Sequence, residues 1–291
     1  MGRKGMLILT GILALGVLSA CGTPKENKNS GHNGTNHNQE NSATPGTGHG
    51  EHGDHNAIEQ PGNSLKASFS FRSETVKANE NSDLNIQITD SDGNSVNEFE
   101  LNHEKLMHLI VVSKDLSFFN HIHPEYNTNG KFAIETSFPN GGEYKVFSDF
   151  VPKGGANTTL SEWVKVEGEE KAQEPIEADT KLVKVVDGKE VELTLSSTKA
   201  KDEVTLTFNI VDAQTKKAIS DLEQYLGAVG HVVILSDDVE QYLHVHPVDE
   251  KATGPKAEFM TSFPNSGTYK IWGQFQHQGE VFTVPFVVDI K

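Results

Sequence analysis

The sequence predicts an all-β protein made of two tandem immunoglobulin-like β-sandwich domains, and three observations support this fold class. Beyond residue 64, short apolar or alternating segments are separated by turn residues, which is the pattern of buried and half-buried strands. No long stretch of helical periodicity interrupts them, and the order of the segments occurs twice. The remaining length suits two domains of about 100 residues each. About seven short strands per domain are typical of the immunoglobulin-like sandwich.

The two repeats span residues 65–168 and 181–291, and a charged segment, residues 169–180 with Pro175, links them. In the first repeat we expect strands at residues 67–73, 83–90, 106–113, 118–123, 131–137, 142–150 and 161–167. In the second repeat we expect strands at residues 191–196, 204–212, 229–236, 241–246, 257–262, 268–275 and 280–290. Because the strand order is the same, we expect the same sandwich twice.

Each repeat carries a tyrosine directly after a matching turn. Phe-Pro-Asn-Gly-Gly-Glu precedes Tyr144, and Phe-Pro-Asn-Ser-Gly-Thr precedes Tyr269. In immunoglobulin-like folds a tyrosine at such a corner donates a hydrogen bond back to the turn. We therefore interpret both tyrosines as structural.

The amino-terminal end predicts export and lipid anchoring. Residues 1–20 begin with Arg3 and Lys4 and continue with an apolar stretch too short to span a bilayer. The tetrapeptide Leu-Ser-Ala-Cys ending at Cys21 resembles a bacterial lipobox, which makes residues 1–20 a lipoprotein signal peptide. We expect acyl chains on Cys21 to hold the mature protein on the extracytoplasmic face of the cell membrane. Cys21 is the only cysteine, so disulfides and thiolate metal sites are excluded.

Residues 21–64 form a polar segment that we expect to be a disordered tether. The segment is rich in Gly, Asn, Ser, Thr and His and has few apolar residues, so it cannot offset its ordering entropy by burial. Its densest histidines, His49, His52 and His55, lie beside acidic residues and can gather a divalent cation loosely. The alternative is a plain polar spacer.

The charge of the chain restricts its partners. The formal net charge is −16, which makes nucleic acid a poor partner and cations better ones.

A histidine triplet with constant spacing occurs once in each repeat. Twelve residues separate its first histidine from the second, and one residue separates the second from the third. The neighbouring residues differ at most positions between the copies, so a shared chemical role explains the constant spacing better than duplication alone. The two triplets are His108, His121 and His123, and His231, His244 and His246.

The spacing brings each triplet together if the flanking apolar segments form an antiparallel hairpin. With a turn centred near Asp115, paired residues have numbers that sum to about 231, which places His108 opposite His123. His121 lies two residues from His123 on the same strand and therefore on the same face. The same arithmetic places His231 opposite His246, with His244 beside it.

Three neutral imidazoles on one face form a tripod that can hold a divalent cation. Zinc accepts three histidines at about 2.0–2.1 Å and keeps a fourth position open, and copper(II) also accepts imidazole. We predict one such site per domain, built from that domain's own histidines. The alternative is a polar cluster that fixes the fold. His103 and His277 have no histidine counterpart in the other repeat, so we expect them on the surface.

Two segments of the first repeat resemble a known group of domains. Residues 107–116 read Met-His-Leu-Ile-Val-Val-Ser-Lys-Asp-Leu, and residues 121–124 read His-Ile-His-Pro. These segments resemble motifs of bacterial extracytoplasmic YtkA-like, immunoglobulin-like domains. The resemblance covers both repeats but not the tether. It implies a secreted or lipid-anchored domain associated with heavy-metal handling.

These observations favour a lipid-anchored carrier, buffer or sensor of copper(II) or zinc(II), served by a metal transporter or sensor partner that the sequence does not identify. A metal-independent cell-surface adhesion or interaction module is the alternative. A zinc-dependent hydrolase is disfavoured, because it needs a general base and the nearest acid, Glu125, corresponds to Val248 in the other repeat. We therefore expect no enzyme.

Overall fold

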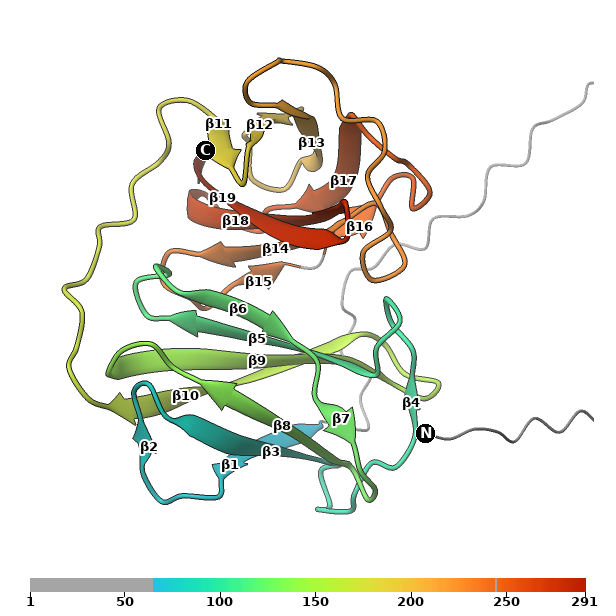
Figure 1. Cartoon of the computed structure of the whole chain (residues 1–291). Helices are drawn as coiled ribbons and strands as arrows, with labels where there is room; N and C mark the ends of the chain where they lie inside the picture. The colour runs from blue at the N-terminus through green and yellow to red at the C-terminus, as the bar shows by residue number, and fades with distance from the viewer. Residues whose placement is uncertain (1–64, 244) are drawn as a thin grey trace, which may run out of the picture. The chain divides into compact units, whose positions relative to one another are not determined.

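The computed structural model describes residues 65–243 and 245–291, and these residues form strands joined by turns and loops (Figure 1). The fold is all-β, with two tandem immunoglobulin-like β-sandwiches, as the sequence predicts. The predicted signal peptide, the lipidation of Cys21, the tether histidines His49, His52 and His55, and His244 all lie outside the described residues. Within the described part of the chain, no helix is long and apolar enough to cross a membrane.

The first repeat consists of two antiparallel sheets. One has the strand order β1-β3-β8-β7, and the other has the order β2-β10-β9-β5-β6 with β4 added against β9; β2 alone pairs in parallel. The strands are β1 (Lys66–Phe71), β2 (Val76–Lys77), β3 (Asn81–Thr89), β4 (Phe99–Glu100), β5 (Met107–Ser113), β6 (Phe119–Ile122), β7 (Glu125–Tyr126), β8 (Lys131–Ser137), β9 (Gly142–Pro152) and β10 (Thr158–Glu167).

The second repeat has the same plan. Its sheets have the orders β11-β12-β13-β17-β16 and β15-β14-β18-β19. The strands are β11 (Val183–Val186), β12 (Lys189–Leu195), β13 (Glu203–Asp212), β14 (His231–Ser236), β15 (Tyr242–Leu243), β16 (His246–Pro247), β17 (Lys256–Ser262), β18 (Gly267–His277) and β19 (Glu280–Ile290). β5 and β6 thus correspond to β14 and β15, and β9 corresponds to β18.

The expected strand positions are largely confirmed, with differences at the ends and at short strands. The expected strands at residues 131–137 and 280–290 coincide with β8 and β19. The sequence did not predict the short strands β2, β4 and β7, or β11, which follows the linker. Most of these are only two residues long and carry no readable alternation.

The corner tyrosines behave as predicted. The hydroxyl of Tyr144 donates to the carbonyl of Asn140 at 2.9 Å, and that of Tyr269 donates to the carbonyl of Asn265 at 3.0 Å. Both rings are buried, so each tyrosine fastens its turn to the core of its own repeat.

β5 is buried along almost its whole length because its two faces contact different clusters. Met107, Leu109 and Val111 belong to the core of the first repeat, whereas Ile110 and Val112 belong to a separate cluster shared with the second repeat. Successive strand residues alternate between faces, so a strand covered on both sides reads as a continuous apolar run. The uninterrupted apolar stretch of β5 therefore reflects contact between the repeats.

The shared cluster, called here the interface core, joins the two repeats within one compact unit. It draws on β5, β9 and the turn after β5 in the first repeat, and on β14, β18 and the turn after β14 in the second. Its buried residues are Ile110, Val112, Leu116, Phe147, Val233, Leu235, Val239 and Trp272.

Polar contacts around the interface core are nearly symmetric. Lys145 follows the corner tyrosine of the first repeat, and its ammonium donates to the carbonyl of Val239 at 2.9 Å. Lys270 holds the same place in the second repeat and donates to the carbonyl of Leu116 at 2.7 Å. Each repeat therefore contacts the hairpin turn of the other, as in an isologous contact between two copies of one fold.

Candidate metal centre

His108 lies at the start of β5 and is 1% exposed. Its Nε2 lies 2.9 Å from the backbone carbonyl oxygen of Asn102, and its Nδ1 lies 3.0 Å from Nε2 of His121. A carbonyl oxygen only accepts hydrogen bonds, so the Nε2–H of His108 donates to Asn102. The proton therefore sits on the outer nitrogen, and Nδ1 presents a lone pair toward His121.

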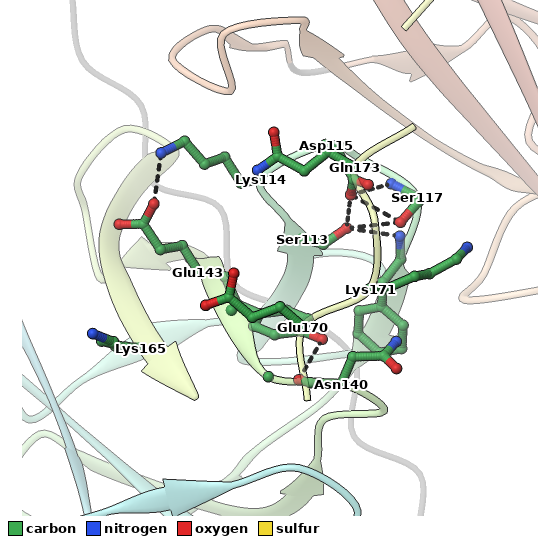
Figure 2. Close-up of a pocket in the computed structure, with 14 residues that line it drawn as sticks. Ser113, Lys114, Asp115, Ser117, Asn140, Glu143, Lys165, Glu170, Lys171 and Gln173 are labelled. Atoms are coloured by element: carbon green, nitrogen blue, oxygen red, sulfur yellow. Dashed lines mark hydrogen bonds and ion pairs between the residues drawn. The ribbon is translucent and has the colours of Figure 1, made fainter. Parts of the chain in front are cut away.

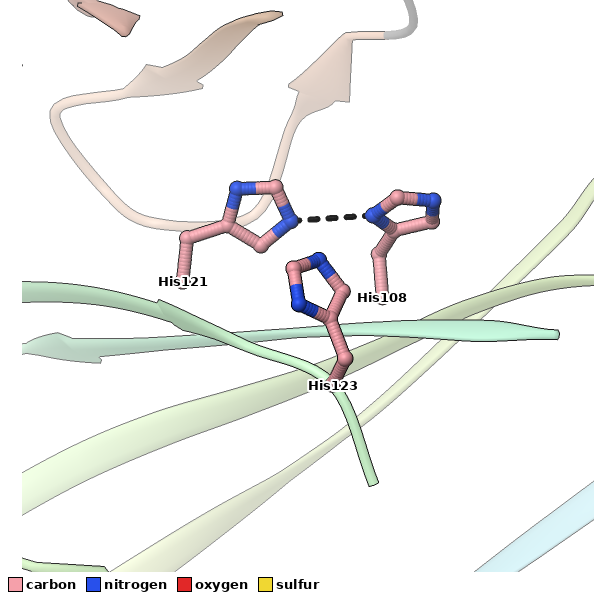
Figure 3. Close-up of side chains that lie close together, drawn as sticks. All are labelled: His108, His121 and His123. Carbon is pink, nitrogen blue, oxygen red and sulfur yellow. Dashed lines mark hydrogen bonds between the residues drawn. The ribbon is translucent and has the colours of Figure 1, made fainter. Parts of the chain in front are cut away.

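The hairpin places the other two histidines as the sequence predicts. Leu109 pairs with Ile122, and Ile110 pairs with His121, so paired numbers sum to 231. This register confirms the predicted hairpin and puts His123, one residue beyond β6, next to His108. One ring nitrogen from each of His108, His121 and His123 lies within 4.8 Å of the others (Figure 3). We call these three residues the histidine cluster.

The outer nitrogen of His121 is bonded to a residue of the second repeat. Nδ1 of His121 lies 2.7 Å from Oε1 of Gln274, and the Gln274 amide nitrogen donates to the hydroxyl of Thr283 at 3.1 Å. That second bond orients the Gln274 oxygen toward His121, so the Nδ1–H of His121 donates. Nε2 of His121 then presents a lone pair to the lone pair on Nδ1 of His108.

His123 completes the set from the crossing segment after β6. Its Nε2 is buried and has no hydrogen-bond partner among the described residues. An unpartnered buried nitrogen costs free energy unless something occupies its lone pair. Within the cluster, therefore, three nitrogens with free lone pairs converge, and two are oriented by hydrogen bonds on the opposite side of the ring.

All three imidazoles are held in the neutral form. Burial and, second, the neighbouring His121 lower the pKa of His108 to about 4, against the opposing effects of the hydrogen bond to Asn102 and of Asp149. Burial also lowers the pKa of His121 and of His123 to about 4. At neutral pH a proton therefore does not fill the space between the facing lone pairs, and neutral imidazole is the form that binds metals.

Two further histidines lie against the cluster. The ring centroid of His231 lies 5.2 Å from that of His108 and 4.8 Å from that of His121, and the His103 ring lies 5.3 Å from His231. The expectation that His103 is a surface residue is therefore wrong, because His103 is half-buried against the cluster. His277, the other such residue, is half-buried beside Asp221 at 3.2 Å.

The second triplet is not assembled in the same way. Ile234 pairs with Leu243, so paired numbers sum to 477 and the predicted hairpin register is correct. His246, however, is exposed and begins β16, which pairs with β17 in the other sheet. His231 instead lies against the cluster of the first repeat. The first triplet is brought together from the first repeat's own histidines, as predicted, and it also contacts Gln274 and His231 of the second repeat, which the sequence did not predict.

Sequence reasoning missed a buried carboxylate behind the cluster. Asp149 is 3% exposed and lies opposite His108 in the β5–β9 ladder. It accepts hydrogen bonds from Asn157 at 2.7 Å and Thr159 at 3.2 Å, and its charge acts to raise the pKa of His108 and His121. Asp149 and Gln274 each lie five residues after a corner tyrosine, and this shared position was the signal that could have identified both.

A surface pocket elsewhere on the first repeat has a structural role (Figure 2). Asp115 accepts from the Ser113 hydroxyl at 2.6 Å and from the backbone of Glu174, in the linker, at 3.1 Å. Burial acts to raise the pKa of Asp115, but hydrogen bonds from Ser113, Ser117 and Glu174 lower it to about 2. Its polar groups bind one another and hold the linker against the hairpin turn.

The fold and the cluster define a tandem immunoglobulin-like protein with a candidate imidazole metal centre. A family described as a domain of unknown function, DUF8832, matches residues 64–168 and again residues 184–291. The chain therefore belongs to this family and carries two copies of its domain. No curated protein matches the chain in sequence.

Several solved structures match over most of the chain at low similarity. The Escherichia coli adhesin FdeC is 14% identical, with 78% of this chain and 66% of that chain covered and a TM-score of 0.27. Invasin, a bacterial integrin-binding protein, is 11% identical, with 77% and 39% covered and a TM-score of 0.24. The Yersinia pseudotuberculosis adhesin InvE is 10% identical, with 76% and 58% covered and a TM-score of 0.24. Each match spans less than two thirds of the other chain. The fold assignment above rests on the strand order of this chain.

Proposed function

We propose that the protein binds one divalent cation, zinc(II) or copper(II), through His108, His121 and His123. A single observation carries the proposal: three imidazole nitrogens, from two buried rings and one half-buried ring, lie within 4.8 Å of one another. Nε2 of His108 and Nδ1 of His121 carry the protons and donate hydrogen bonds away from the cluster. The other nitrogen of each ring therefore has a lone pair that points into the cluster. A second bond of this kind to a carbonyl or amide oxygen is the usual support of a metal-binding histidine.

The surroundings of the cluster favour a cation over a purely structural polar cluster. In the neutral state the facing lone pairs of His108 and His121, 3.0 Å apart, repel each other, and burial disfavours the proton that would relieve this. A cation removes the repulsion and also binds the unpartnered nitrogen of His123. The carboxylate of Asp149 behind the ring of His108 offsets part of the charge that the cation brings.

The donor set restricts the metal. Three neutral nitrogens suit zinc(II) and copper(II), whereas calcium and magnesium take oxygen ligands. A blue-copper centre needs a cysteine ligand, and the only cysteine of the chain is Cys21. The cluster supplies three ligands and so leaves a fourth coordination position for water or a further side chain.

We propose one cation per chain rather than one per domain. The rings of His108 and His231, the first histidines of the two triplets, lie 5.2 Å apart and contact the same space. His246 is exposed, so the described part of the second triplet does not offer a separate tripod. A weaker, loosely held supply at His49, His52 and His55 of the tether remains part of the proposal.

The proposed location is the extracytoplasmic face of the cell membrane, with acyl chains on Cys21 as the anchor. The lipobox-like tetrapeptide ending at Cys21 supports this proposal. In that position the protein acts as a carrier, buffer or sensor of the cation, with a metal transporter or sensor as its partner, and not as an enzyme.

The test is metal binding by the full chain in a background that removes the tether histidines. In this background His32, His37, His49, His52 and His55 are replaced by asparagine, and calorimetric titration with zinc(II) and copper(II) should give one tight site. His108→Ala should weaken binding by roughly 100-fold or more, because a ligand is lost. His277→Ala is the matched control, since this half-buried histidine lies beside Asp221 and outside the cluster.

The alternative is a metal-independent adhesion or interaction module, which the immunoglobulin-like fold also permits. No cation binding by the background chain, or binding that His108→Ala leaves unchanged, would contradict the metal proposal and leave the histidines as a structural cluster. The interaction module would then be the better hypothesis.

A further inference from the structure

We infer that the cation also fastens the second repeat onto the first, so that metal occupancy and docking of the two repeats are thermodynamically coupled. This inference rests on the proposed metal site and adds a role for two residues of the second repeat, His231 and Gln274. His231 packs against the rings of His108 and His121 from the second repeat, and Gln274 positions His121 for ligation.

The ring distances support a site that crosses the interface. Within the cluster, ring centroids are 5.2 Å apart for His108 and His121, 5.0 Å for His108 and His123, and 4.8 Å for His121 and His123. His231 lies 5.2 Å from His108 and 4.8 Å from His121, which is the same range. Imidazoles that share one tetrahedral zinc, each bound at about 2.1 Å, have ring centres about 5 Å apart. His231 therefore lies within the same group of rings and covers the site from the second repeat, stacked on His108 with the ring planes 12° apart, whereas the nitrogens that converge are those of His108, His121 and His123.

The second repeat presents His231 and Gln274 together. The two residues lie directly opposite each other in the β14–β18 ladder, so their side chains share one face. Gln274 is buried and contacts Nδ1 of His121 at 2.7 Å. The same pair of strands supplies Val233, Leu235 and Trp272 to the interface core. The metal centre is thus continuous with the surface through which the repeats contact each other.

The remainder of the interface explains why a cation would matter here. The interface core stabilises docking by apolar burial, and the hydrogen bonds of Lys145 and Lys270 to the opposite hairpin turns add to it. The histidine end instead buries neutral rings whose lone pairs face each other, and this arrangement opposes docking until a cation binds. A cation bound there removes the repulsion between the lone pairs, so this part of the contact between the repeats then favours docking.

Coupling of this kind is reciprocal. If the cation binds the docked arrangement more tightly than the undocked one, then any change that loosens docking must lower cation affinity by the same factor. A change that loosens docking should therefore lower cation affinity, whereas a site that depends on the first repeat alone would keep its affinity. The test uses a residue that contacts the other repeat and is not itself a histidine of the site.

Trp272 meets this requirement. It is buried in the interface core and stacks on Phe119 of the first repeat with ring centroids 4.7 Å apart. Trp272→Ala in the full background chain should lower zinc affinity about fivefold or more, within the usual range of coupling. Phe259→Leu, which reduces the second repeat's own core and lies outside the interface core, is the matched control and should leave zinc affinity unchanged.

The positioning role of Gln274 has its own matched pair of variants. Gln274→Leu removes the acceptor for His121 and should weaken zinc binding about 10- to 100-fold. Gln274→Glu keeps an acceptor at the same place and should restore tight binding, which a general loss of folding would not allow. His231→Ala should weaken zinc binding by about 10-fold, since it removes the ring stacked on His108 and leaves the three converging nitrogens in place.

Amide hydrogen exchange with and without zinc gives the structural readout. Zinc should slow exchange in β14 and β18 as well as in β5 and β6, and His231→Ala should abolish the effect in β14 and β18. Tight zinc binding with wild-type affinity in Trp272→Ala, Gln274→Leu and His231→Ala, together with protection confined to the first repeat, would overturn the coupling but leave the metal site intact. Failure of the background chain to bind zinc at all would overturn the proposed function itself.

Discussion

The two repeats share a strand plan and a hairpin register but differ in how they use the same histidine spacing. In the first repeat His108 and His121 are buried and converge with His123, whereas in the second His246 is exposed and His231 lies against the first repeat's cluster. The conserved element is therefore the pairing of the hairpin, and the difference lies in the surroundings of the rings.

A single corresponding position illustrates how those surroundings differ. The residue opposite the first histidine in the neighbouring strand is Asp149 in the first repeat and Gln274 in the second. Asp149 supports its own repeat's histidines with a negative charge, whereas the side chain of Gln274 donates to Thr283 and accepts from His121 of the other repeat. The first repeat therefore provides the histidine cluster, and the second repeat supports it.

The largest expected effect is a loss of stability of the metal-free chain at low pH, which comes from the buried histidines of the first repeat and not from the exposed His246 of the second. The pKa of His108 and of His121 falls from 6.5 to about 4 on folding, because burial disfavours the charged form. The unfolded chain therefore binds protons that the folded chain does not, and stability present above pH 6.5 is lost as pH falls toward 4. Each buried histidine contributes on the order of 3 kcal/mol to this loss.

Urea unfolding of the metal-free background chain at pH 7.5 and 4.5 measures this effect. Replacing His108, His121 and His123 with asparagine should flatten the dependence between these pH values. His246→Ala should leave it unchanged, because this side chain is exposed. A triple variant with the wild-type slope would show that other groups carry the pH dependence.

The next largest effect is expected at Asp149 and Gln274, which lie opposite the first histidine of each triplet. Asp149→Leu removes a buried carboxylate and leaves Asn157 and Thr159 without this acceptor, and it should destabilise the fold by about 3 kcal/mol. Gln274→Leu loses one bond to Thr283 and one to His121, both neutral, and should cost about 1 to 2 kcal/mol. Thermal or urea unfolding measures both, and a larger loss for Gln274→Leu would reverse the proposed assignment of roles.

A smaller and equal effect is expected where the repeats are alike. Tyr144→Phe and Tyr269→Phe each remove a single hydrogen bond to a turn carbonyl, and each should cost about 1 kcal/mol. Urea unfolding of the two variants should give the same loss within error. A large difference between them would mean that the two repeats are not equivalent even at their corners.

The sequence predicted the parts of the molecule that depend on local pairing. The position of each turn and the apolar strands beside it predict which residues pair in the hairpin. The predicted residue numbers of each pair add up to 231 in the first repeat and 477 in the second, and both registers are correct. The corner tyrosines follow in the same way. The burial of Asp149 and the contact of Gln274 with His121 could not be predicted, because both depend on strands distant in sequence and on packing between the repeats. The continuous apolar run of β5 indicated burial on both faces but not the partner.

The smallest expected effect concerns His246, the exposed histidine of the second triplet. If only the first triplet holds a cation, His246→Ala in the background chain should leave zinc stoichiometry at one, zinc affinity unchanged and stability within about 0.5 kcal/mol, as for an exposed surface substitution. Calorimetric titration and urea unfolding check the three quantities together. A background chain that binds two zinc ions, and loses one of them in His246→Ala, would show that the second triplet also assembles into a site. The two repeats would then differ in affinity and not in kind, and the original expectation of one site per domain would be restored.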